Sequence, residues 1–377
     1  MTSTRPETGG DPAPAATPSA EAVAERLLEA AVGAMDLLAV YLGDRLGWYA
    51  SLCGEGPATP EELAARTQTS PRYAREWLEQ QAVTGLLEVT DDARFRLPSA
   101  VAEVLTDPTS LAFLAPLSRM LVAPVAQMPA LLDAYRTGGG VPWSRLGADA
   151  RESQADMNRP WYESVLPGAL ASVPHLHEAL SRPDARIAEI GCGGGWASIA
   201  LARAYPAAEV HAYDVDAATV QLAQANVRSG GLEGQVRVMQ TDAAGLPEGE
   251  YDVLFAFECL HDMPYPVEVL SAAGRALRPG GAVVVMDEAV AAEFQPNGDL
   301  LERLMYGFSL LICLPDGMAH PGSAGTGTVM RESTVRAYAE QAGLGALSVL
   351  PIEDFGFWRF YELRDPAAAG PDVRRVG

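Results

Sequence analysis

The sequence predicts an α/β protein with a doubly wound, mostly parallel sheet in its C-terminal half and a smaller helical domain before it. Apolar runs of strand length alternate with helical segments over residues 186–285, a pattern typical of a parallel sheet with helices on both faces. A glycine-rich loop follows the first of these strands. Two capped helices and a hairpin lie nearer the N-terminus, and this order predicts a winged helix.

The first 137 residues predict a tail followed by a helical domain. Residues 1–20 are rich in Thr, Pro, Ala and Gly without hydrophobic period, so we expect a disordered tail. Apolar residues recur at helical spacing over residues 21–52, which predicts one long amphipathic helix. The winged-helix domain is expected to span residues 21–137. Its last part, residues 110–135, is rich in Leu, Met and Phe and is compatible with a dimer interface or with a buried helix.

The winged helix itself is predicted by its turn chemistry. Helices are expected to start at Thr59-Pro60 and at Ser70-Pro71, because proline favours the first helical position. Residues 84–97 then read as the hairpin. Residues 58–97 contain five arginines against seven acids, whereas a helix that reads DNA needs a positive face. We therefore expect no nucleic-acid partner, and keep a DNA-binding ligand sensor as an alternative.

The rest of the chain divides into a connection, a sheet domain and a lid. Residues 138–180 are expected to form a helical linker, and residues 181–365 the α/β domain. Within that domain, residues 289–329 interrupt the strand and helix alternation with a helix that is apolar on more than one face, which predicts a lid insertion. The expected C-terminal elements are a helix at 333–342, strands at 346–351 and 356–363, and a tail at 366–377.

Composition limits the classes of partner. The formal net charge of −22 disfavours a nucleic-acid substrate, because such a ligand requires cationic surface. No apolar run reaches the ~18 residues of a membrane span, and no signal-like start is present, so we expect no membrane partner and a cytoplasmic location. The four cysteines show no paired spacing, which indicates free thiols. The chain has no lysine, which excludes Schiff-base chemistry on a lysine.

The glycine loop predicts a nucleotide-like ligand. Gly191, Gly193 and Gly195 follow the apolar strand that contains Glu189, and a helix-forming run begins after them. Glycines let the backbone approach a ligand closely, and the helix N-terminus opens beside it. A dinucleotide fingerprint would require glycine at the position of Trp196. The spacing therefore disfavours NAD.

Acidic residues close the following strands. Asp214 ends the next apolar run, 19 positions after Gly195, and Asp242 ends the one after that. These are C-terminal strand ends, where open α/β sheets bind ligands, and an acid about 20 residues past the loop suits ribose hydroxyls. From Ile187 to Asp287, this ordered set resembles the class I S-adenosylmethionine-dependent methyltransferases. With the N-terminal winged helix, the chain resembles small-molecule members that carry such a dimerisation domain.

The resemblance implies a Rossmann-like sheet of seven strands with an antiparallel terminal hairpin, a homodimer formed through the N-terminal domain, and S-adenosyl-L-methionine as cofactor. Glu189 is expected at the methionine ammonium and Asp214 at the ribose. Asp242 and Ala243 are expected at the adenine. The remaining residues expected to contact the cofactor are Gly191, Gly193, Gly195, Phe257 and Glu258.

His261 is the candidate general base. It lies just past the fourth strand, and a neutral imidazole suits proton removal from a hydroxyl. The segment resembles the L-H-D-W segment of plant-type and polyketide O-methyltransferases, with Met263 in place of the tryptophan. A structural or substrate-orienting histidine is the alternative. Asp262 is a candidate to hold the imidazole tautomer, with helix capping as its alternative; Asp287 and Glu288 could orient His261, contact substrate or cap a loop.

Aromatic and apolar residues are the candidate substrate contacts. Trp161 and Tyr162 precede the sheet domain where relatives cover the methionine end of the cofactor, although interdomain packing explains them equally well. Met305, Phe308 and Ser309 belong to the predicted lid, and a second buried core is the alternative. No convincing set of metal ligands is found in the sequence, so we expect no metal.

These observations predict methyl transfer from S-adenosylmethionine to a small, mostly apolar secondary metabolite. Transfer to oxygen is favoured because His261 offers a base. Two alternatives stay open: the same fold and cofactor with cyclisation or decarboxylative hydroxylation, and the DNA-binding ligand sensor.

Overall fold

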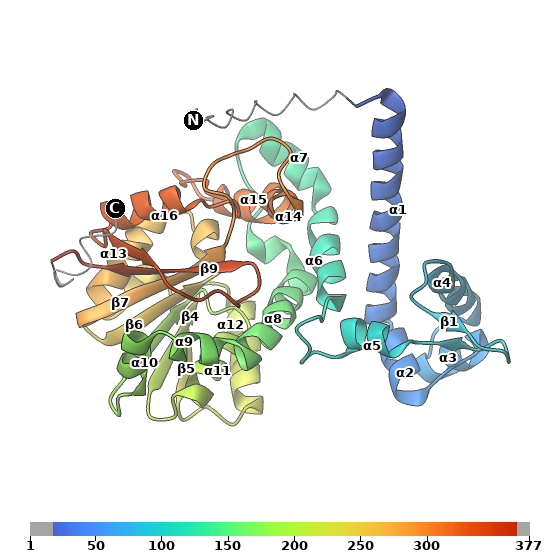
Figure 1. Cartoon of the computed structure of the whole chain (residues 1–377), viewed down its shortest axis with the longest axis horizontal. Helices are drawn as coiled ribbons and strands as arrows, with labels where there is room; N and C mark the ends of the chain where they lie inside the picture. The colour runs from blue at the N-terminus through green and yellow to red at the C-terminus, as the bar shows by residue number, and fades with distance from the viewer. Residues whose placement is uncertain (1–17, 368–377) are drawn as a thin grey trace, which may run out of the picture.

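A computed structural model describes residues 18–367 (Figure 1). The tails predicted at 1–20 and 366–377 therefore lie almost entirely outside the described residues. The first element, α1 (Ala20–Arg45), is a 26-residue helix that begins at the N-cap Ser19. It stands apart from the sheet domain along most of its length (Figure 1).

The prediction of one helix over residues 21–52 is wrong. The chain turns at Gly47, whose φ of +70° favours glycine, and a separate helix α2 (Trp48–Glu55) follows. Before the break, α1 exposes apolar side chains along its outer length. These are Val23, Leu27, Leu28, Val32, Met35, Leu38 and Leu42.

The winged helix follows as predicted. Helix α3 (Pro60–Thr67) begins with a reciprocal capping box between Thr59 and Glu62, which satisfies two backbone donors. It packs against α4 (Pro71–Val83). The wing is a short antiparallel pair, β1 (Glu88–Val89) and β2 (Phe95–Arg96), and α5 (Ser99–Thr106) leaves it. Trp48, Tyr49 and Trp77 fill the small core with tilted and edge-on ring contacts.

Five helices join the winged helix to the sheet: α6 (Ala115–Val125), α7 (Met128–Thr137), α8 (Gly147–Ser164), α9 (Leu166–Ala171) and α10 (Pro174–Ser181). Helix α6 packs against both α1 and α8, and α8 packs against the first helix of the sheet domain. Arg119 of α6 is buried and pairs with Asp44 of α1 and Asp156 of α8. The segment predicted as a linker is thus an integral layer of the fold.

Seven strands form the main sheet, in the order β5-β4-β3-β6-β7-β9-β8. Strands β3 to β7 are mutually parallel, and β9 runs antiparallel to β7 and β8. The seven-stranded fold with its antiparallel terminal hairpin, as predicted, is confirmed. The strands are β3 (Arg186–Ile190), β4 (Glu209–Asp214), β5 (Val236–Gln240), β6 (Tyr251–Phe257), β7 (Leu277–Glu288), β8 (Ala346–Val349) and β9 (Trp358–Arg364).

Helices cover both faces of this sheet (Figure 1). Alternate residues of β3 point to opposite faces, so Ile187 joins one buried cluster and Ala188 the other. The first cluster contains α9, α10 and α11 (Trp196–Ala204), and the second contains α13 (Pro266–Ala276) and α16 (Glu332–Gln341). Helix α12 (Ala217–Ser229) follows β4.

The insertion after β7 lies over the C-terminal ends of the strands. Its helix α14 (Leu300–Phe308) continues into a π turn at Ser309–Cys313, and α15 (Leu314–Gly317) follows. Turns of this kind are frequent at functional sites. Cys313 and Ile312 are buried there against Met120 and Leu146 of the helical layer.

Candidate active site

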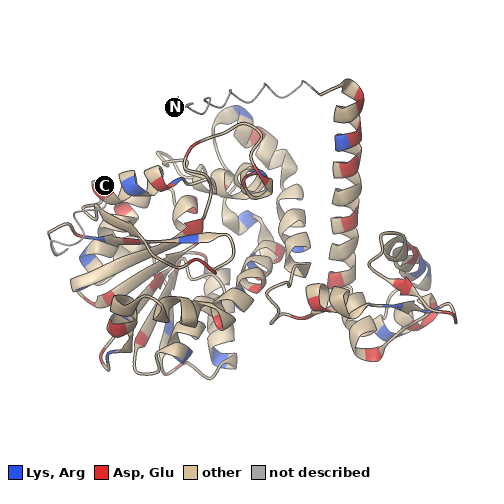
Figure 2. Ribbon diagram, in the orientation of Figure 1, with Lys and Arg blue, Asp and Glu red and all other residues tan. Residues whose placement is uncertain are grey.

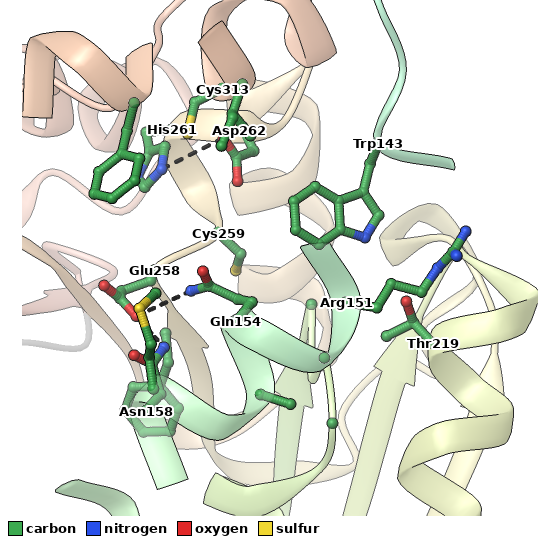
Figure 3. A pocket seen from close by; sticks show the side chains of 18 of the residues that line it. Trp143, Arg151, Gln154, Asn158, Thr219, Glu258, Cys259, His261, Asp262 and Cys313 are labelled. Atoms are coloured by element: carbon green, nitrogen blue, oxygen red, sulfur yellow. Dashed lines mark hydrogen bonds and ion pairs between the residues drawn. The ribbon is translucent and has the colours of Figure 1, made fainter. Parts of the chain in front are cut away.

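A cavity of about 650 Å³ opens at the C-terminal ends of β3, β4, β6 and β7. Its walls come from the sheet, from α8 and from the insertion. Figure 3 shows His261, Asp262 and Cys313 at one end and Glu258, Gln154 and Asn158 at another, with Trp143 to one side. The cavity therefore joins segments that lie far apart in the sequence.

Each of the three glycines in the loop occupies a position that disfavours a side chain. All three adopt positive φ, +64° at Gly191, +51° at Gly193 and +76° at Gly195, where other residues are strained. A Cβ on Gly191 would lie 2.7 Å from the Cβ of Cys259, and one on Gly195 would lie 3.2 Å from the Cβ of Ala223. A Cβ on Gly193 would meet nothing within 4 Å. Two glycines thus allow close packing, and the middle one lines the cavity.

Asp214 lies beside this loop at the end of β4. Its Oδ2 accepts a hydrogen bond from the Gly193 backbone N–H at 3.1 Å, and its Oδ1 accepts one from Asp216 N–H at 2.9 Å. Burial raises the pKa of Asp214 in spite of these bonds. Next to it, Arg151 of α8 donates to Asp216 at 2.6 Å. The loop and the strand end are held together by the same carboxylate.

Glu189 is buried at the end of β3 and lines the cavity. It accepts a hydrogen bond from the Ser198 hydroxyl. Burial, reinforced by the charge of Asp214, raises the pKa of Glu189 to about 8 in spite of that bond. A positively charged group beside Glu189 would favour its ionised form.

Glu258 follows β6 with a φ of +48°, an unusual conformation for a residue other than glycine. Its carboxylate accepts hydrogen bonds from the side chains of Asn158 and Trp358, and from Gln154 at 3.4 Å. Burial nevertheless raises the pKa of Glu258 to about 7. Backbone strain held in place by surrounding bonds is common at functional sites.

His261 is 3% exposed and lies between three carboxyl groups. Its Nδ1 lies 2.9 Å from Oδ1 of Asp287 and 3.4 Å from Oε2 of Glu288. Its Nε2 lies 3.4 Å from Oδ1 of Asp262. The sequence offered Asp262 as a residue that holds the tautomer and Asp287 as one that orients His261. In the structure Asp287 makes the hydrogen bond to Nδ1, because the end of β7 lies beside that of β6.

Charge controls the protonation of this cluster. Burial alone would lower the pKa of His261, but the negative charges of Asp287, Asp262 and Glu288 outweigh it and raise that pKa well above its usual value. Burial raises the pKa of Glu288, although the charge of His261 opposes the rise. The surrounding carboxyl groups therefore favour the protonated imidazole, and an added positive charge beside them would favour the neutral form.

Most of the predicted site residues meet at this cavity. Those that line it are Glu189, Gly191, Gly193, Asp214, Phe257, Glu258, His261, Asp262, Trp161, Tyr162, Met305 and Phe308. Trp161 also packs edge-on against Trp358 of the sheet domain, as the packing interpretation expects; its contact with a cofactor or substrate stays a prediction.

Four predicted residues do not line the cavity. Gly195 is turned toward α12, as its contact with Ala223 shows. Asp242 is exposed and caps a short turn by accepting from Ala244 N–H at 2.8 Å, and Ala243 is buried in that turn. Ser309 is buried in the π turn. Ser309 is therefore buried, as expected for the alternative in which the insertion forms a second core.

Sequence reasoning named Trp161 and Tyr162 of α8 but missed the polar residues of this helix. Arg151, Gln154 and Asn158 line the cavity from α8 together with Trp161. The four residues recur at intervals of three and four positions, so they share one helical face. That spacing was the available signal for the polar residues.

Two groups of described side chains have the spacing of metal ligands: His261, Asp287 and Glu288, and His261, Asp262 and Cys313, with ligand atoms within 4.8 Å of one another. Nδ1 of His261 and Oδ1 of Asp287 are already paired. Burial raises the pKa of the Cys313 thiol, which disfavours the thiolate that binds metals.

Two family models match the chain. One describes a methyltransferase domain and matches residues 187–281. The other describes an Rv2258c-like winged HTH domain and matches residues 33–107. Residues 187–281 are thus a methyltransferase domain, preceded by a winged helix, and the fold is that of the class I methyltransferases.

Curated relatives match the chain over part of their length. A 27-O-demethylrifamycin SV methyltransferase of Amycolatopsis mediterranei is 30% identical over 151 residues, 38% of this chain and 54% of that protein. A ubiquinone biosynthesis O-methyltransferase of Nitrosococcus oceani is 34% identical over 110 residues, 29% of this chain and 46% of that protein. The chain thus spans about half the length of these relatives.

Solved structures match nearly the whole fold. The mitomycin 7-O-methyltransferase superposes with a TM-score of 0.70 at 22% identity, covering 92% of this chain and 98% of that one. Human N-acetylserotonin methyltransferase in complex with SAM superposes with a TM-score of 0.67 at 19% identity, covering 93% and 99%. At such identities the likeness concerns the fold, including the position of the winged helix before the sheet domain.

Proposed function

We propose that this protein is an S-adenosylmethionine-dependent methyltransferase that transfers the methyl group to a hydroxyl of a small, mostly apolar secondary metabolite. The observation that carries the proposal is the cavity itself, which joins the glycine loop and Asp214 to a buried histidine. The matched methyltransferase domain covers most of the parallel strands that form it. The functions of the two curated relatives, which act on oxygen, support transfer to oxygen.

The cofactor would lie against the ends of β3 and β4. The space beside Gly193, where a Cβ would meet nothing, and the neighbouring Asp214 carboxylate suit a ribose. Glu189 would hold the methionine ammonium, and Phe257 and Glu258 would line its inner side. When bound, S-adenosylmethionine supplies a methyl group on a positively charged sulfur. Asp242 and Ala243 stay predicted as adenine contacts, although they do not line the described cavity.

His261 would act as the general base. Its Nδ1 is held by Asp287, so its Nε2 is the atom free to accept the proton of a substrate hydroxyl as the new oxygen–carbon bond forms and the carbon–sulfur bond breaks. Asp262, 3.4 Å from Nε2, would stabilise the resulting imidazolium. Asp287 and Glu288 lie at Nδ1, so they would affect the proton transfer through the orientation and charge of the imidazole ring. Binding of a cation beside this cluster would lower the pKa of His261 and prepare it to accept a proton.

Met305 and Phe308 would contact the apolar part of the substrate, with Trp161 and Tyr162 on the opposite wall. The exposed apolar side chains of α1 would be covered by a second copy of the chain, which makes a homodimer the proposed assembly. A patch of this length on a helix rarely stays in contact with water.

The alternative of a DNA-binding sensor has less support. Each arginine of residues 58–97 has a carboxylate partner: Arg66 with Glu55, Arg72 with Glu76, Arg75 with Glu61, Arg94 with Glu62, and Arg96 with Glu88. Acidic and basic residues alternate over this domain (Figure 2), whereas DNA binding needs free cations.

No helix among residues 18–367 is long and apolar enough to cross a membrane.

Calorimetry tests the proposal directly. We expect S-adenosylmethionine and its demethylated product, S-adenosylhomocysteine, to bind the full chain with a stoichiometry of one per chain, and NAD not to bind. A hydroxylated aromatic substrate panel with mass detection should then give products heavier by one methylene. Absence of binding by both sulfur compounds would contradict the cofactor, and a binding protein without any methylated product would favour the non-methylating alternatives.

A further inference from the structure

The end of the cavity around His261 holds more carboxyl groups than basic side chains. Seven carboxyl side chains line the cavity, whereas only one of its described lining residues is an arginine. That arginine, Arg151, is already paired with Asp216. The carboxyl groups of the cavity other than Asp216 therefore have no arginine among the described lining residues to neutralise them.

Three of those carboxyl groups gather at the His261 end, from three different elements. Asp262 follows β6, Glu288 ends β7 and Asp316 belongs to α15. Oδ1 of Asp262 and Oε2 of Glu288 are buried; each lies 3.4 Å from a ring nitrogen of His261 but makes no hydrogen bond. The hydrogen bond recorded for the Asp316 side chain is to the backbone N–H of Trp143, at 2.7 Å. One imidazolium at His261 cannot balance these groups together with Asp287.

An independent observation points to a ligand at this place. The hydroxyl of Thr328, a residue only 2% exposed, has no hydrogen-bond partner and lines the same cavity. Buried polar atoms are normally satisfied, so this hydroxyl is available to pair with a ligand at this end. Burial and the charge of Asp262 also raise the pKa of Asp316 to about 7, as expected for a carboxyl group that lacks a cationic partner.

We propose, on the basis of the methyltransferase function above, that the methyl acceptor carries a protonated amine, and that Asp262, Glu288 and Asp316 form its binding subsite beside His261. The acceptor is then a hydroxylated, mostly apolar amine. An ammonium group brings one positive charge and N–H donors, which are what the three carboxyl groups lack.

The walls favour an organic cation over a metal ion. Trp143, Phe308 and Met305 line the same cavity. Aromatic faces attract organic cations, whereas these side chains are not ligands for hard divalent metals. Of the charges of the proposed cofactor, the ammonium would lie at Glu189, at the end of β3, and only the sulfonium would approach the substrate beside His261. One sulfonium charge does not balance three carboxyl groups, and S-adenosylhomocysteine lacks that charge.

The experiment compares two probes of the same shape. The full chain is saturated with S-adenosylhomocysteine, and binding of 1-naphthylmethylamine and 1-naphthalenemethanol is measured by calorimetry at about pH 7.5, where the amine is protonated. We expect the amine to bind at least about tenfold more tightly than the alcohol. Asp316→Asn should remove most of this preference and leave the affinity for the alcohol and for S-adenosylhomocysteine unchanged.

Asp133→Asn is the matched control, because Asp133 is exposed on α7 and does not line the cavity; it should keep the preference. If Asp316→Asn does not fold, Glu288→Gln takes its place. Equal affinities for the two probes, or a preference that survives both substitutions, would overturn the proposal. A further result would also overturn the proposal: Zn²⁺ displaces the amine, and the same variants bind Zn²⁺ more weakly. That result would assign the subsite to a metal ion.

The outcome is separable from that of the proposed function. Binding of S-adenosylhomocysteine is measured first, and the two probes are compared with and without it. A protein that prefers the amine but does not bind S-adenosylhomocysteine would retain the cationic subsite and lose the methyltransferase assignment. A protein that binds S-adenosylhomocysteine without preferring the amine would lose the subsite alone.

Discussion

Nδ1 of His261 lies 2.9 Å from Oδ1 of Asp287, and the two side chains are only 3% and 0% exposed. The residues are 26 positions apart in the chain, yet β6 and β7 are adjacent parallel strands whose ends coincide. This contact orients the imidazole and directs Nε2 toward Asp262. In the proposed reaction it defines which nitrogen accepts the proton.

Removal of the imidazole tests the base. We expect His261→Ala to lower kcat about 10²- to 10⁴-fold, the usual contribution of general base catalysis, while the affinity for S-adenosylhomocysteine stays within about twofold. His177→Ala, an exposed histidine on α10, should have neither effect. Turnover by His261→Ala at the rate of the unaltered protein would assign His261 a structural role.

The pH profile tests Asp287 as a positioning residue. Because neighbouring carboxylates raise the pKa of His261 above its usual value, the neutral base forms only as pH rises through that elevated pKa. We expect kcat/KM to increase with pH through a pKa above ~6.5. In Asp287→Asn this increase should move to lower pH, and kcat should fall because the ring is less well oriented. In Asp287→Glu the rise of kcat/KM should return to the pH range of the unaltered protein. Identical pH profiles of the unaltered protein, Asp287→Asn and Asp287→Glu would contradict this role.

The glycine loop is tested by adding a single methyl group. Gly191→Ala places a Cβ 2.7 Å from the Cβ of Cys259 at a φ of +64°, so we expect the free energy of unfolding to fall by about 1–3 kcal/mol and cofactor affinity to weaken. Gly54→Ala in α2, where a Cβ meets nothing within 4 Å, should be neutral or stabilising by about 0.4–1 kcal/mol. Chemical denaturation and calorimetry measure both. An unaffected Gly191→Ala would show that the loop tolerates a side chain.

The outer face of α1 is tested by charge. Leu28 and Met35 are each 67% exposed, and we expect the double substitution to Glu to convert a dimer into a monomer by sedimentation, because two charges would be buried in an apolar contact. Val83→Glu, at an 88% exposed position on α4, is the control and should leave the assembly unchanged. A monomer already in the unaltered protein would contradict the proposed homodimer.

The sequence by itself determined the order of the strands and helices, the winged helix and the position of the glycine loop. These follow from local causes: hydrophobic period, the Thr59-Pro60 start and glycine at positions of positive φ. Local patterns were insufficient at Gly47, which breaks a helix whose apolar period continues across it, and at Ser309, where the expected helix widens into a π turn.

Only the tertiary structure decided which side chains meet at the site. Asp287 rather than Asp262 holds Nδ1 of His261 because adjacent strand ends bring residues together that the chain separates. In the same way, Asn158 and Gln154 of α8 hold Glu258, and Asp316 of α15 lies beside Asp262. Burial and net charge around these groups depend on all the elements packed against them, which is why their raised pKa values and the negative end of the cavity have no local signature in the sequence.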